Sequence, residues 1–341
     1  MRYQIFTGIG LLVSLSLFCQ KTTGSENGGG TNPPPSFRPA SLGWVGDSTD
    51  VQTPTSAGIV IMGGGTDVDA AFQWMIERSG GGNAVIIRAS GTSAYNPYVY
   101  KLGKLASVET LKIDSRDLAD NESVARIIRN AELLFIAGGD QSNYMNYWRG
   151  TKTADALNYL LTVKKVPVGG TSAGAAILGS LYYSGEAGSA TSGPAMANPY
   201  APTVTLYQDD FLQAPFLKNV ITDQHYVARN RQGRHLAFLA RLMKDKSLAP
   251  KGIAVDEKTA VCIDKDGTAK VIGRSKAYFL FTERAKQPEE CSPGQPLQWV
   301  AGNKAVRVYE LQGTAEGNGN FRVADFDFSK ARGGTRYWWW V

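Results

Sequence analysis

The chain has 341 residues, 43% of them hydrophobic, and a formal net charge of +6 at pH 7. This length and apolar content allow a sizeable core, in one large α/β domain or two small ones, and they exclude a disordered chain. The lysines and arginines are spread along the sequence without blocks that could follow a phosphate backbone, which argues against nucleic acid as a partner.

The N-terminus predicts export. A short basic start precedes an apolar run over residues 9–18, which is too short to span a bilayer and is typical of a signal peptide. Cys19 ends this run, and residues 20–39 are rich in Gly, Ser, Thr, Asn and Pro. The pattern predicts a tether lipidated at Cys19, although Leu17 and Phe18 stand where a bacterial lipoprotein signal has small residues.

Two interpretations of this segment stay open. In one, Cys19 carries a lipid anchor, and the domain is held at a membrane, in the periplasm or on the cell surface. In the other, a signal peptidase cuts further along, so that Cys19 is removed and the protein is secreted. The predicted organisation is a signal peptide over 1–18, a flexible tether over 19–44 and one domain over 45–341.

From residue 58 onward, apolar runs end at glycines and are followed by helix-like stretches. This is the pattern of parallel strands with crossover helices, so we expect an α/β fold with a mostly parallel sheet flanked by helices. The expected strands are 58–62, 84–87, 133–137, 166–168, 220–222 and 253–255. The expected helices are one capped by Asp67 and those over 123–129 and 231–243.

The pattern changes beyond residue 253. Short apolar segments at 260–263, 269–272 and 306–311 are separated by Gly and Asp turns, which predicts antiparallel strands toward the C-terminus. Residues 184–202 are rich in Gly, Ser and Pro and predict a long loop near the site. The aromatic end at 338–340 suits either a packed edge strand or an interaction patch.

Residues 170–174 read Gly-Thr-Ser-Ala-Gly and have the spacing of a nucleophile elbow between a strand and a helix. Such a turn holds Ser172 in a strained conformation, and a side chain at either glycine would collide with the crossing strand or helix. The amide of Ala173, at the start of the helix, could then donate to an oxyanion. The alternative is a glycine-rich turn in which Ser172 only caps the helix.

The chain contains two histidines. His225 follows a predicted strand end, so we expect it at the same sheet edge as Ser172, where it can act as a general base. His235 lies inside a predicted helix among arginines, and the helical spacing favours a surface or packing role.

An imidazole base needs a third group that fixes its tautomer and stabilises its charged form. The candidates are Glu257 and Asp256, at the end of the strand expected at 253–255, and the nearby Asp223. Residues 256 and 257 are equally suited to an ordinary hairpin turn, so the sequence leaves the choice open.

A second glycine turn, Gly-Gly-Asp-Gln at 138–141, also follows a strand, and open α/β sheets bind ligands beyond such ends. A backbone amide of Gly139 or Asp140 could be the second oxyanion donor, unless the turn serves only to reverse the chain. A phosphate loop is disfavoured because no Gly-Lys-Ser or Gly-Lys-Thr follows.

Three arginines, Arg229, Arg231 and Arg234, follow His225 closely. A guanidinium fork suits the recognition of a carboxylate, so we expect one or two of them to contact substrate. A solvated basic helix face is the alternative.

The domain retains two cysteines, Cys262 and Cys291, which are too few for a disulfide framework. Cys262 lies in an apolar run and suits a buried free thiol better than a bridge. Neither cysteine has the setting of a nucleophile or a metal ligand.

Taken together, these motifs resemble the cyanophycinases, a group that includes the α-aspartyl dipeptidases. The resemblance rests on Gly-Gly-Thr-Ser-Ala-Gly-Ala at 169–175 and Asp-Gln-His-Tyr at 223–226. It extends to the arginine series, to 138–141 and to Gly-Ile-Ala-Val-Asp-Glu at 252–257, and so covers most of residues 58–272. It implies a fold like that of the class I glutamine amidotransferases, with a serine in place of the usual cysteine nucleophile.

The resemblance also implies an activity, the hydrolysis of β-aspartyl peptide bonds through an acyl-enzyme, with no metal or organic cofactor. Cyanophycinases cut β-aspartyl-arginine units from a storage polymer, so an exported relative would use that polymer or other Asp-containing peptides outside the cell. The residues expected at the site are Ser172, His225 and Glu257 for catalysis, Gly139, Asp140 and Ala173 for the oxyanion, and Gln141, Asp223, Gln224, Arg229, Arg231 and Arg234 for the substrate.

The resemblance leaves two segments unassigned, residues 184–202 and the Trp-rich C-terminus. The sequence also does not decide between a monomer and a homodimer. The alternative to an enzyme is a non-catalytic surface lipoprotein that keeps the fold to bind peptides or polymer.

Overall fold

A computed structural model describes residues 38–47 and 49–341. The predicted signal peptide and Cys19 lie outside these residues. The predicted tether boundary at residue 45 falls inside a strand, because residues 41–44 already pair with the sheet. Arg38 supports this earlier start, since its Nε donates to the buried carboxylate of Glu109 at 3.0 Å.

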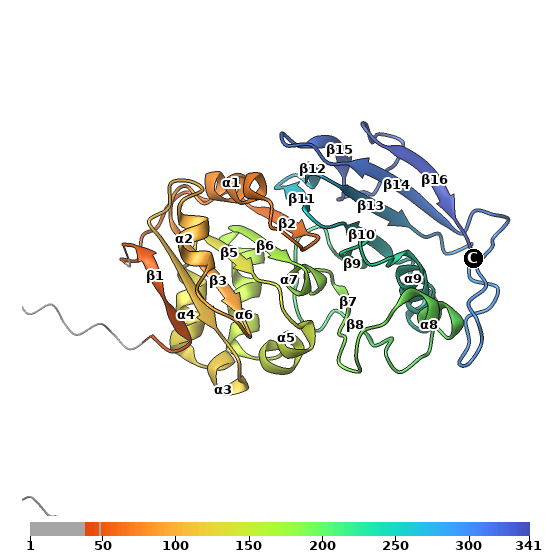
Figure 1. Ribbon diagram of the computed structural model, residues 1–341, viewed down its shortest axis with the longest axis horizontal. Coiled ribbons are helices and arrows are strands. Elements are labelled where there is room, and N and C mark those ends of the chain that lie inside the picture. The colour runs from red at the N-terminus through yellow and green to blue at the C-terminus, as the bar shows by residue number, and fades with distance from the viewer. Residues whose placement is uncertain (1–37, 48) are drawn as a thin grey trace, which may run out of the picture. The chain divides into compact units, whose positions relative to one another are not determined.

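The described strands form two sheets (Figure 1). The first has nine strands, in the order β1 (Ser41–Gly46), β4 (Ser107–Lys112), β3 (Asn83–Arg88), β5 (Leu133–Ile136), β6 (Pro167–Thr171), β2 (Gly58–Met62), β11 (Thr259–Asp264), β12 (Thr268–Gly273) and β15 (Asn318–Arg322). The second has seven, in the order β16 (Thr335–Trp339), β14 (Val306–Gln312), β13 (Lys276–Phe281), β10 (Lys251–Val255), β9 (Val220–Gln224), β7 (Leu181–Tyr183) and β8 (Leu206–Gln208).

The centre of the first sheet is parallel. The neighbours β4, β3, β5, β6 and β2 all run in the same direction, and in the second sheet β10 and β7 run parallel to β9. Antiparallel pairs join β11 to β2 and β12, and β14 to β13 and β16. The predicted α/β class, parallel core and antiparallel C-terminal strands are confirmed, although the strands are divided between two sheets.

The helices of the described chain are α1 (Asp69–Arg78), α2 (Tyr95–Tyr100), α3 (Arg116–Ala119), α4 (Glu122–Asn130), α5 (Gln141–Trp148), α6 (Lys152–Tyr159), α7 (Ala173–Ala176), α8 (Ser192–Ala197) and α9 (Gln232–Lys246), with a π-helical turn at Leu160–Lys164. Side-chain oxygens cap the start of three of them: Ser115 accepts from an amide of the first turn of α3, Asn121 does so for α4, and Asp140 does so for α5. No helix among the described residues is long and apolar enough to cross a membrane.

Successive side chains of the central strands pack alternately on the two faces of the first sheet, as expected for strands buried on both faces. On β2, Val60 and Met62 pack with α1 and α2, whereas Ile59 and Ile61 face the cluster that contains α4, α5 and α6. This second cluster continues to one face of the second sheet, through Phe279 on β13. The other face of the second sheet packs against α8 and α9. The two sheets therefore share one core. Cys262 and Cys291 are both buried free thiols.

Candidate active site

Ser172 lies on the sharp turn between β6 and α7, in a conformation that few side chains adopt. Its φ is +52° and its ψ is −118°. A Cβ at Gly170 would stand 2.5 Å from the carbonyl carbon of Gly174, and a Cβ at Gly174 would stand 2.2 Å from the carbonyl oxygen of Ile136 on β5. The turn therefore requires both glycines, and it lifts the serine beyond the end of the strand.

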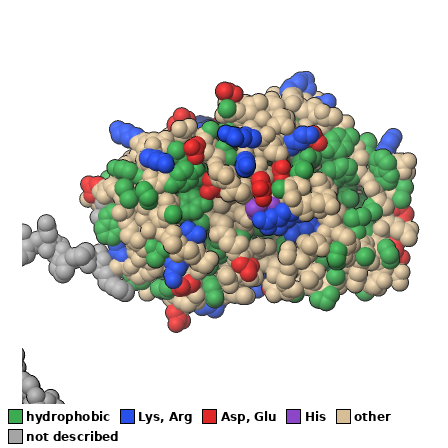
Figure 2. All heavy atoms as spheres, in the orientation of Figure 1, with side chains coloured by type: hydrophobic (Ala, Val, Ile, Leu, Met, Phe, Trp, Pro, Cys, Tyr) green, Lys and Arg blue, Asp and Glu red, His purple; other side chains and the backbone are tan. Residues whose placement is uncertain are grey.

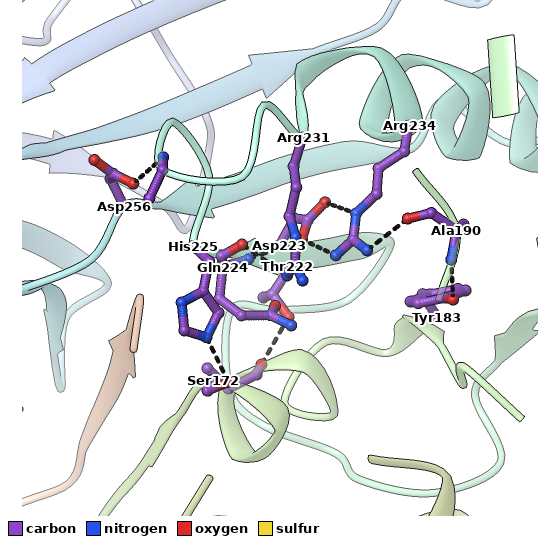
Figure 3. A network of polar contacts seen from close by, with 12 residues as sticks. Ser172, Tyr183, Ala190, Thr222, Asp223, Gln224, His225, Arg231, Arg234 and Asp256 are labelled. Atoms are coloured by element: carbon purple, nitrogen blue, oxygen red, sulfur yellow. Dashed lines mark hydrogen bonds and ion pairs between the residues drawn. The ribbon is translucent and has the colours of Figure 1, made fainter. Parts of the chain in front are cut away.

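The hydroxyl of Ser172 begins a chain of two hydrogen bonds. Its Oγ lies 2.7 Å from Nε2 of His225, and Nδ1 of His225 lies 2.6 Å from Oε1 of Glu257. Figure 3 shows the imidazole directly over the serine. The three residues follow the carboxyl ends of β6, β9 and β10, so both sheets contribute to the site.

The end of β2 joins these two sheets at the site. The carbonyl of Met62 accepts a hydrogen bond from the amide of Ser172 at 3.1 Å, and the carbonyl of Gly63 accepts one from the amide of His225 at 2.7 Å. Two consecutive carbonyls, at the last residue of β2 and the residue after it, thus fix the backbones of Ser172 and His225. Figure 2 shows histidine reaching the surface among basic and acidic side chains.

The environment of His225 favours its neutral form. The ring is 5% exposed, and this burial lowers its pKa from the ordinary 6.5; the charges of Arg229 and Arg231 lower it further, while Glu257 opposes them. A neutral ring that donates from Nδ1 to the carboxylate of Glu257 leaves Nε2 as an acceptor for the proton of Ser172.

Residues 63–65, three consecutive glycines, make room for the histidine and the glutamate. A Cβ at Gly64 would stand 2.4 Å from Cε1 of His225, and one at Gly65 would stand 3.1 Å from Oε2 of Glu257. Both glycines have positive φ, +92° and +73°. The sequence signal for this part of the site, which the predicted site residues do not include, is three glycines directly after a fully buried strand.

Of the three carboxylates proposed to orient the base, only Glu257 contacts His225. Asp256 accepts from the amides of Val227 and Ala228, both at 3.0 Å, and from the hydroxyl of Ser275 at 2.6 Å. It therefore shapes the turn that follows the histidine.

Asp223 is buried and pairs with Arg234, as Figure 3 shows. Nε of Arg234 donates to Oδ2 of Asp223 at 2.9 Å, and its Nη1 donates to the carbonyl of Ala190 at 3.0 Å. Burial alone would raise the pKa of Asp223, but the charge and hydrogen bonds of Arg234 outweigh it and hold the pKa below its usual value. This pair lies behind the site, so a direct contact of either side chain with substrate stays a prediction.

The other two arginines differ in exposure, because Arg231 is buried and Arg229 is exposed. Nη1 of Arg231 donates to the carbonyl of Gln224 at 2.9 Å, and burial, with the neighbouring charge of Arg234, lowers the pKa of Arg231 to about 10. Arg229 is exposed, and its charge acts on His225. Arg229 is thus the member of the series most open to a ligand. The side-chain oxygen of Gln224 is buried and has no hydrogen-bond partner within the described residues.

The turn at Gly138 also lies beside Ser172. A Cβ at Gly138 would stand 3.5 Å from Cβ of Ser172, and the next residue but one, Asp140, caps α5. Gln141 is the first residue of α5, and its side chain reaches the segment 184–202, because its Nε2 lies 2.9 Å from the Cβ position of Gly185. The predicted oxyanion donors, the amides of Gly139, Asp140 and Ala173, all belong to the two turns around Ser172.

Residues 184–202 contain a helix, α8, where the sequence predicted a continuous loop. The hydroxyl of Ser192 accepts from the amide of Arg234 at 3.1 Å, and the hydroxyl of Tyr183 accepts from the amide of Ala190 at 2.7 Å. The segment is therefore attached to the arginine-bearing part of the site. Within the described chain, no three His, Cys, Asp or Glu side chains are grouped as metal ligands.

Comparison with known proteins decides the family. Residues 59–271, which include Ser172, His225 and Glu257, match the family model of Peptidase family S51. The chain belongs to peptidase family S51. A cyanophycinase of Synechococcus elongatus is 30% identical over 175 residues, which cover 51% of this chain and 49% of that protein. A cyanophycinase of Geminocystis herdmanii is 27% identical over 210 residues, 59% of this chain and 71% of that protein.

The S51 chain spans about half the length of the Synechococcus relative. Among solved structures, a peptidase from an acI-B1 Actinobacterium is 17% identical with a TM-score of 0.49, and the match covers 77% of this chain and 96% of that one. The assignment to family S51 rests on the sequence match.

Proposed function

We propose that this chain is a serine peptidase that hydrolyses β-aspartyl peptide bonds through an acyl-enzyme at Ser172. The observation that carries the proposal is the continuous chain of contacts from the serine Oγ through His225 to Glu257, at 2.7 and 2.6 Å. A nucleophile, a base and a group that orients the base are the set that acyl transfer needs.

In the first step, His225 Nε2 takes the proton of Ser172 while Oγ attacks the carbonyl carbon of the substrate. The carboxylate of Glu257 stabilises the imidazolium that forms. The oxyanion accepts hydrogen bonds from the amide of Ala173 and from the Gly139 turn. The imidazolium then protonates the leaving amine, the C–N bond breaks, and an ester to Ser172 remains.

In the second step, His225 removes a proton from a water molecule, which attacks the ester carbonyl. The resulting tetrahedral intermediate collapses, Ser172 leaves and regains its proton from the imidazolium, and the acid product is released. Every proton that His225 accepts is therefore returned within one turnover.

The arginine series supports an acidic acyl group. Arg229 is exposed beside the base, and Arg231 lies next to it with one face toward the buried Asp223. A guanidinium at this point can bind the free carboxylate of an aspartyl residue joined through its β-carboxyl group. Cyanophycin-like polymer and other Asp-containing peptides are the substrates we propose, because two relatives of the chain are cyanophycinases.

Export is a further part of the proposal and rests on the sequence alone. Its signals, the apolar run and Cys19, precede the described residues. An exported peptidase would act on polymer or peptides outside the cell, either from a lipid anchor or as a secreted protein.

A fluorophosphonate probe tests the mechanism, because it captures only an activated serine. We expect labelling of the wild-type protein at Ser172, and none in Ser172→Ala, whose kcat on β-aspartyl-arginine should fall at least about 10³-fold. Ser189→Ala is the matched control, since this serine is exposed in the neighbouring segment and should leave labelling unchanged. Hydrolysis that survives in Ser172→Ala contradicts the mechanism.

A panel of β-aspartyl and α-aspartyl dipeptides tests the specificity separately. A higher kcat/KM on the β-linked member of each pair supports the proposal. Equal values, or a preference for the α-linked peptides, would show a serine peptidase of different specificity.

A further inference from the structure

A groove of about 460 Å³ is lined by residues of β14 and β16 and of the loops beside them. Figure 1 shows where these two strands lie in the second sheet. None of the residues proposed for the active site lines it. Its lining combines cationic and aromatic side chains: Glu283, Lys286, Lys304, Arg307, Val308, Phe328, Arg336, Tyr337 and Trp338. We call it the C-terminal groove.

Aromatic rings hold the cations of this groove in place. Arg307 on β14 is opposite Phe281 on β13 and Trp338 on β16 in the strand register. Its guanidinium carbon lies 5.6 and 5.8 Å from the centroids of these two rings, and 5.3 Å from that of Phe328. The ammonium of Lys286 lies 4.0 Å from the ring of Trp338. Cation–π contacts thus fix side chains that would otherwise move freely in water.

The positive charge of the groove is not balanced locally. Its one carboxylate, Glu283, pairs with Lys286 at 3.2 Å. Arg336 donates to the carbonyls of Phe328 and Ala331, so its N–H groups have partners. These neutral partners do not balance its positive charge. Lys304 is exposed, and in the described part of the chain neither it, Arg307 nor Arg336 has a carboxylate within 4.0 Å. Three cations therefore face one groove without a counter-ion of the protein.

We propose that the C-terminal groove binds an acidic polypeptide through its carboxylates. Arginine forks and a lysine suit carboxylates, and the apolar rings offer contact to the chain between them. A groove of about 460 Å³ has room for a few side chains. Nucleic acid is disfavoured, because three unpaired cations in one groove do not form a track for a phosphate backbone.

The groove lies within reach of the active site for a long chain only. Three strand spacings separate β14 from β9, about 14 Å at the usual distance between strands. Phe281 pairs with Lys251, at the end of β10 remote from the catalytic edge, which adds four residues or about 13 Å. The combined separation is about 20 Å, which an extended peptide spans with about six residues.

On the assumption of the proposed function, the groove binds the free carboxylates of a long Asp-rich substrate while one end of this substrate reaches Ser172. Binding at two points makes the second contact intramolecular, which raises the affinity for long chains but does nothing for short ones. The same surface thus selects polymer over dipeptide.

Binding is tested in the Ser172→Ala protein, so that hydrolysis does not interfere. The probe is fluorescently labelled poly-L-aspartate, followed by anisotropy. We expect Lys304→Glu and Arg307→Gln each to weaken binding about tenfold at low salt. Arg126→Glu, which places the same charge change on the exposed face of α4, should leave the dissociation constant unchanged. Lys304 is exposed, so its replacement does not threaten the fold.

Two outcomes overturn the proposal: equal affinity of Lys304→Glu and Arg126→Glu for poly-L-aspartate, or competition by a single-stranded oligonucleotide at the same concentration of charges. The link to hydrolysis is tested in proteins that retain Ser172. Lys304→Glu should raise KM about tenfold for a long β-aspartyl polymer and leave the dipeptide KM unchanged. If wild-type protein hydrolyses neither substrate, the proposed function fails, while the anisotropy result still decides the groove.

Discussion

At the residue scale, the proposed reaction depends on the fraction of His225 that is neutral. Burial, aided by Arg229 and Arg231, holds the pKa of the ring below 6.5. A base with a lowered pKa keeps its lone pair to lower pH, so the acid limb of kcat/KM should have its midpoint below pH 6.5. Arg229→Ala removes a cation that disfavours the imidazolium. The pKa of His225 should therefore rise, and the acid limb should move to higher pH.

The pH profile of kcat/KM measures this shift, since it reports the titration of the free enzyme. Arg126→Ala is the control, because it deletes an equally exposed arginine on α4. An acid limb that stays in place in Arg229→Ala, or moves to lower pH, would show that the charge at 229 does not act on the base.

The sequence pattern selects some residues of the candidate site and leaves others open. The elbow motif and the small number of histidines were enough to select Ser172 and His225. The residue pattern alone left Glu257 and Asp256 open, because the two adjacent carboxylates differ only in the direction in which the backbone points them after β10; the family resemblance selected Glu257. In the structure one points to the imidazole and the other to the amides of the next turn.

At the scale of elements, the glycine turn after β2 fixes the distance between the first sheet and His225. Gly64→Ala should displace the ring, because its new Cβ would stand 2.4 Å from His225 Cε1. We expect the rate of fluorophosphonate labelling to fall at least about 10²-fold, as for a small misplacement of reacting groups.

A matched control separates this collision from backbone strain. Gly43 on β1 has a φ of +93°, nearly the +92° of Gly64, but no atom lies within 4 Å of its Cβ position. Gly43→Ala should therefore cost about 1 kcal/mol of stability and leave labelling intact. Equal loss of labelling in the two variants would show that strain, and not contact with the histidine, is responsible.

The elements themselves were predicted where the pattern was simple. The buried strands β2, β3 and β5 lie close to their expected ranges, because continuous apolar runs ended by glycine are distinctive. β4 was missed, since its sequence SVETLK carries polar residues that are buried by contacts such as that of Glu109 with Arg38. No local pattern reveals such a partner.

At the scale of the whole molecule, the division into two sheets was not predictable from the strands. β10 and β11 follow each other after a short turn, yet β10 joins the second sheet and β11 pairs with β2 in the first. The chain crosses between sheets at Asp256 and Glu257, which is why these residues stand where both sheets meet Ser172. Strand propensity describes each segment but not its choice of neighbour.

The stability of the molecule should also depend on a histidine that the reaction does not use. His235 on α9 is fully buried, next to the ring of Tyr226, and neither ring nitrogen has a hydrogen-bond partner within the described residues. Burial lowers its pKa to about 4; Asp223 opposes this change and Arg234 adds to it. Of the two roles predicted for His235, at the surface or in packing, the structure shows packing.

The sign of the effect follows from proton uptake. The unfolded chain protonates His235 as the pH falls below about 6.5, whereas the folded chain does so only near 4. Acid therefore favours the unfolded state across this window, and the free energy of unfolding should drop by about 3 kcal/mol on its account. His235→Leu puts an apolar side chain of similar size at this position and removes this acid-induced loss of stability.

Urea unfolding between pH 7 and pH 4 measures the difference. The free energy of unfolding should fall less steeply with decreasing pH in His235→Leu than in the wild-type protein. Leu242→Ala, a cavity-forming change on the same helix, should lower stability by about 2–5 kcal/mol at every pH and keep the wild-type slope. Parallel curves for wild type and His235→Leu would mean that His235 is protonated in the folded protein, and that its buried nitrogens find partners there.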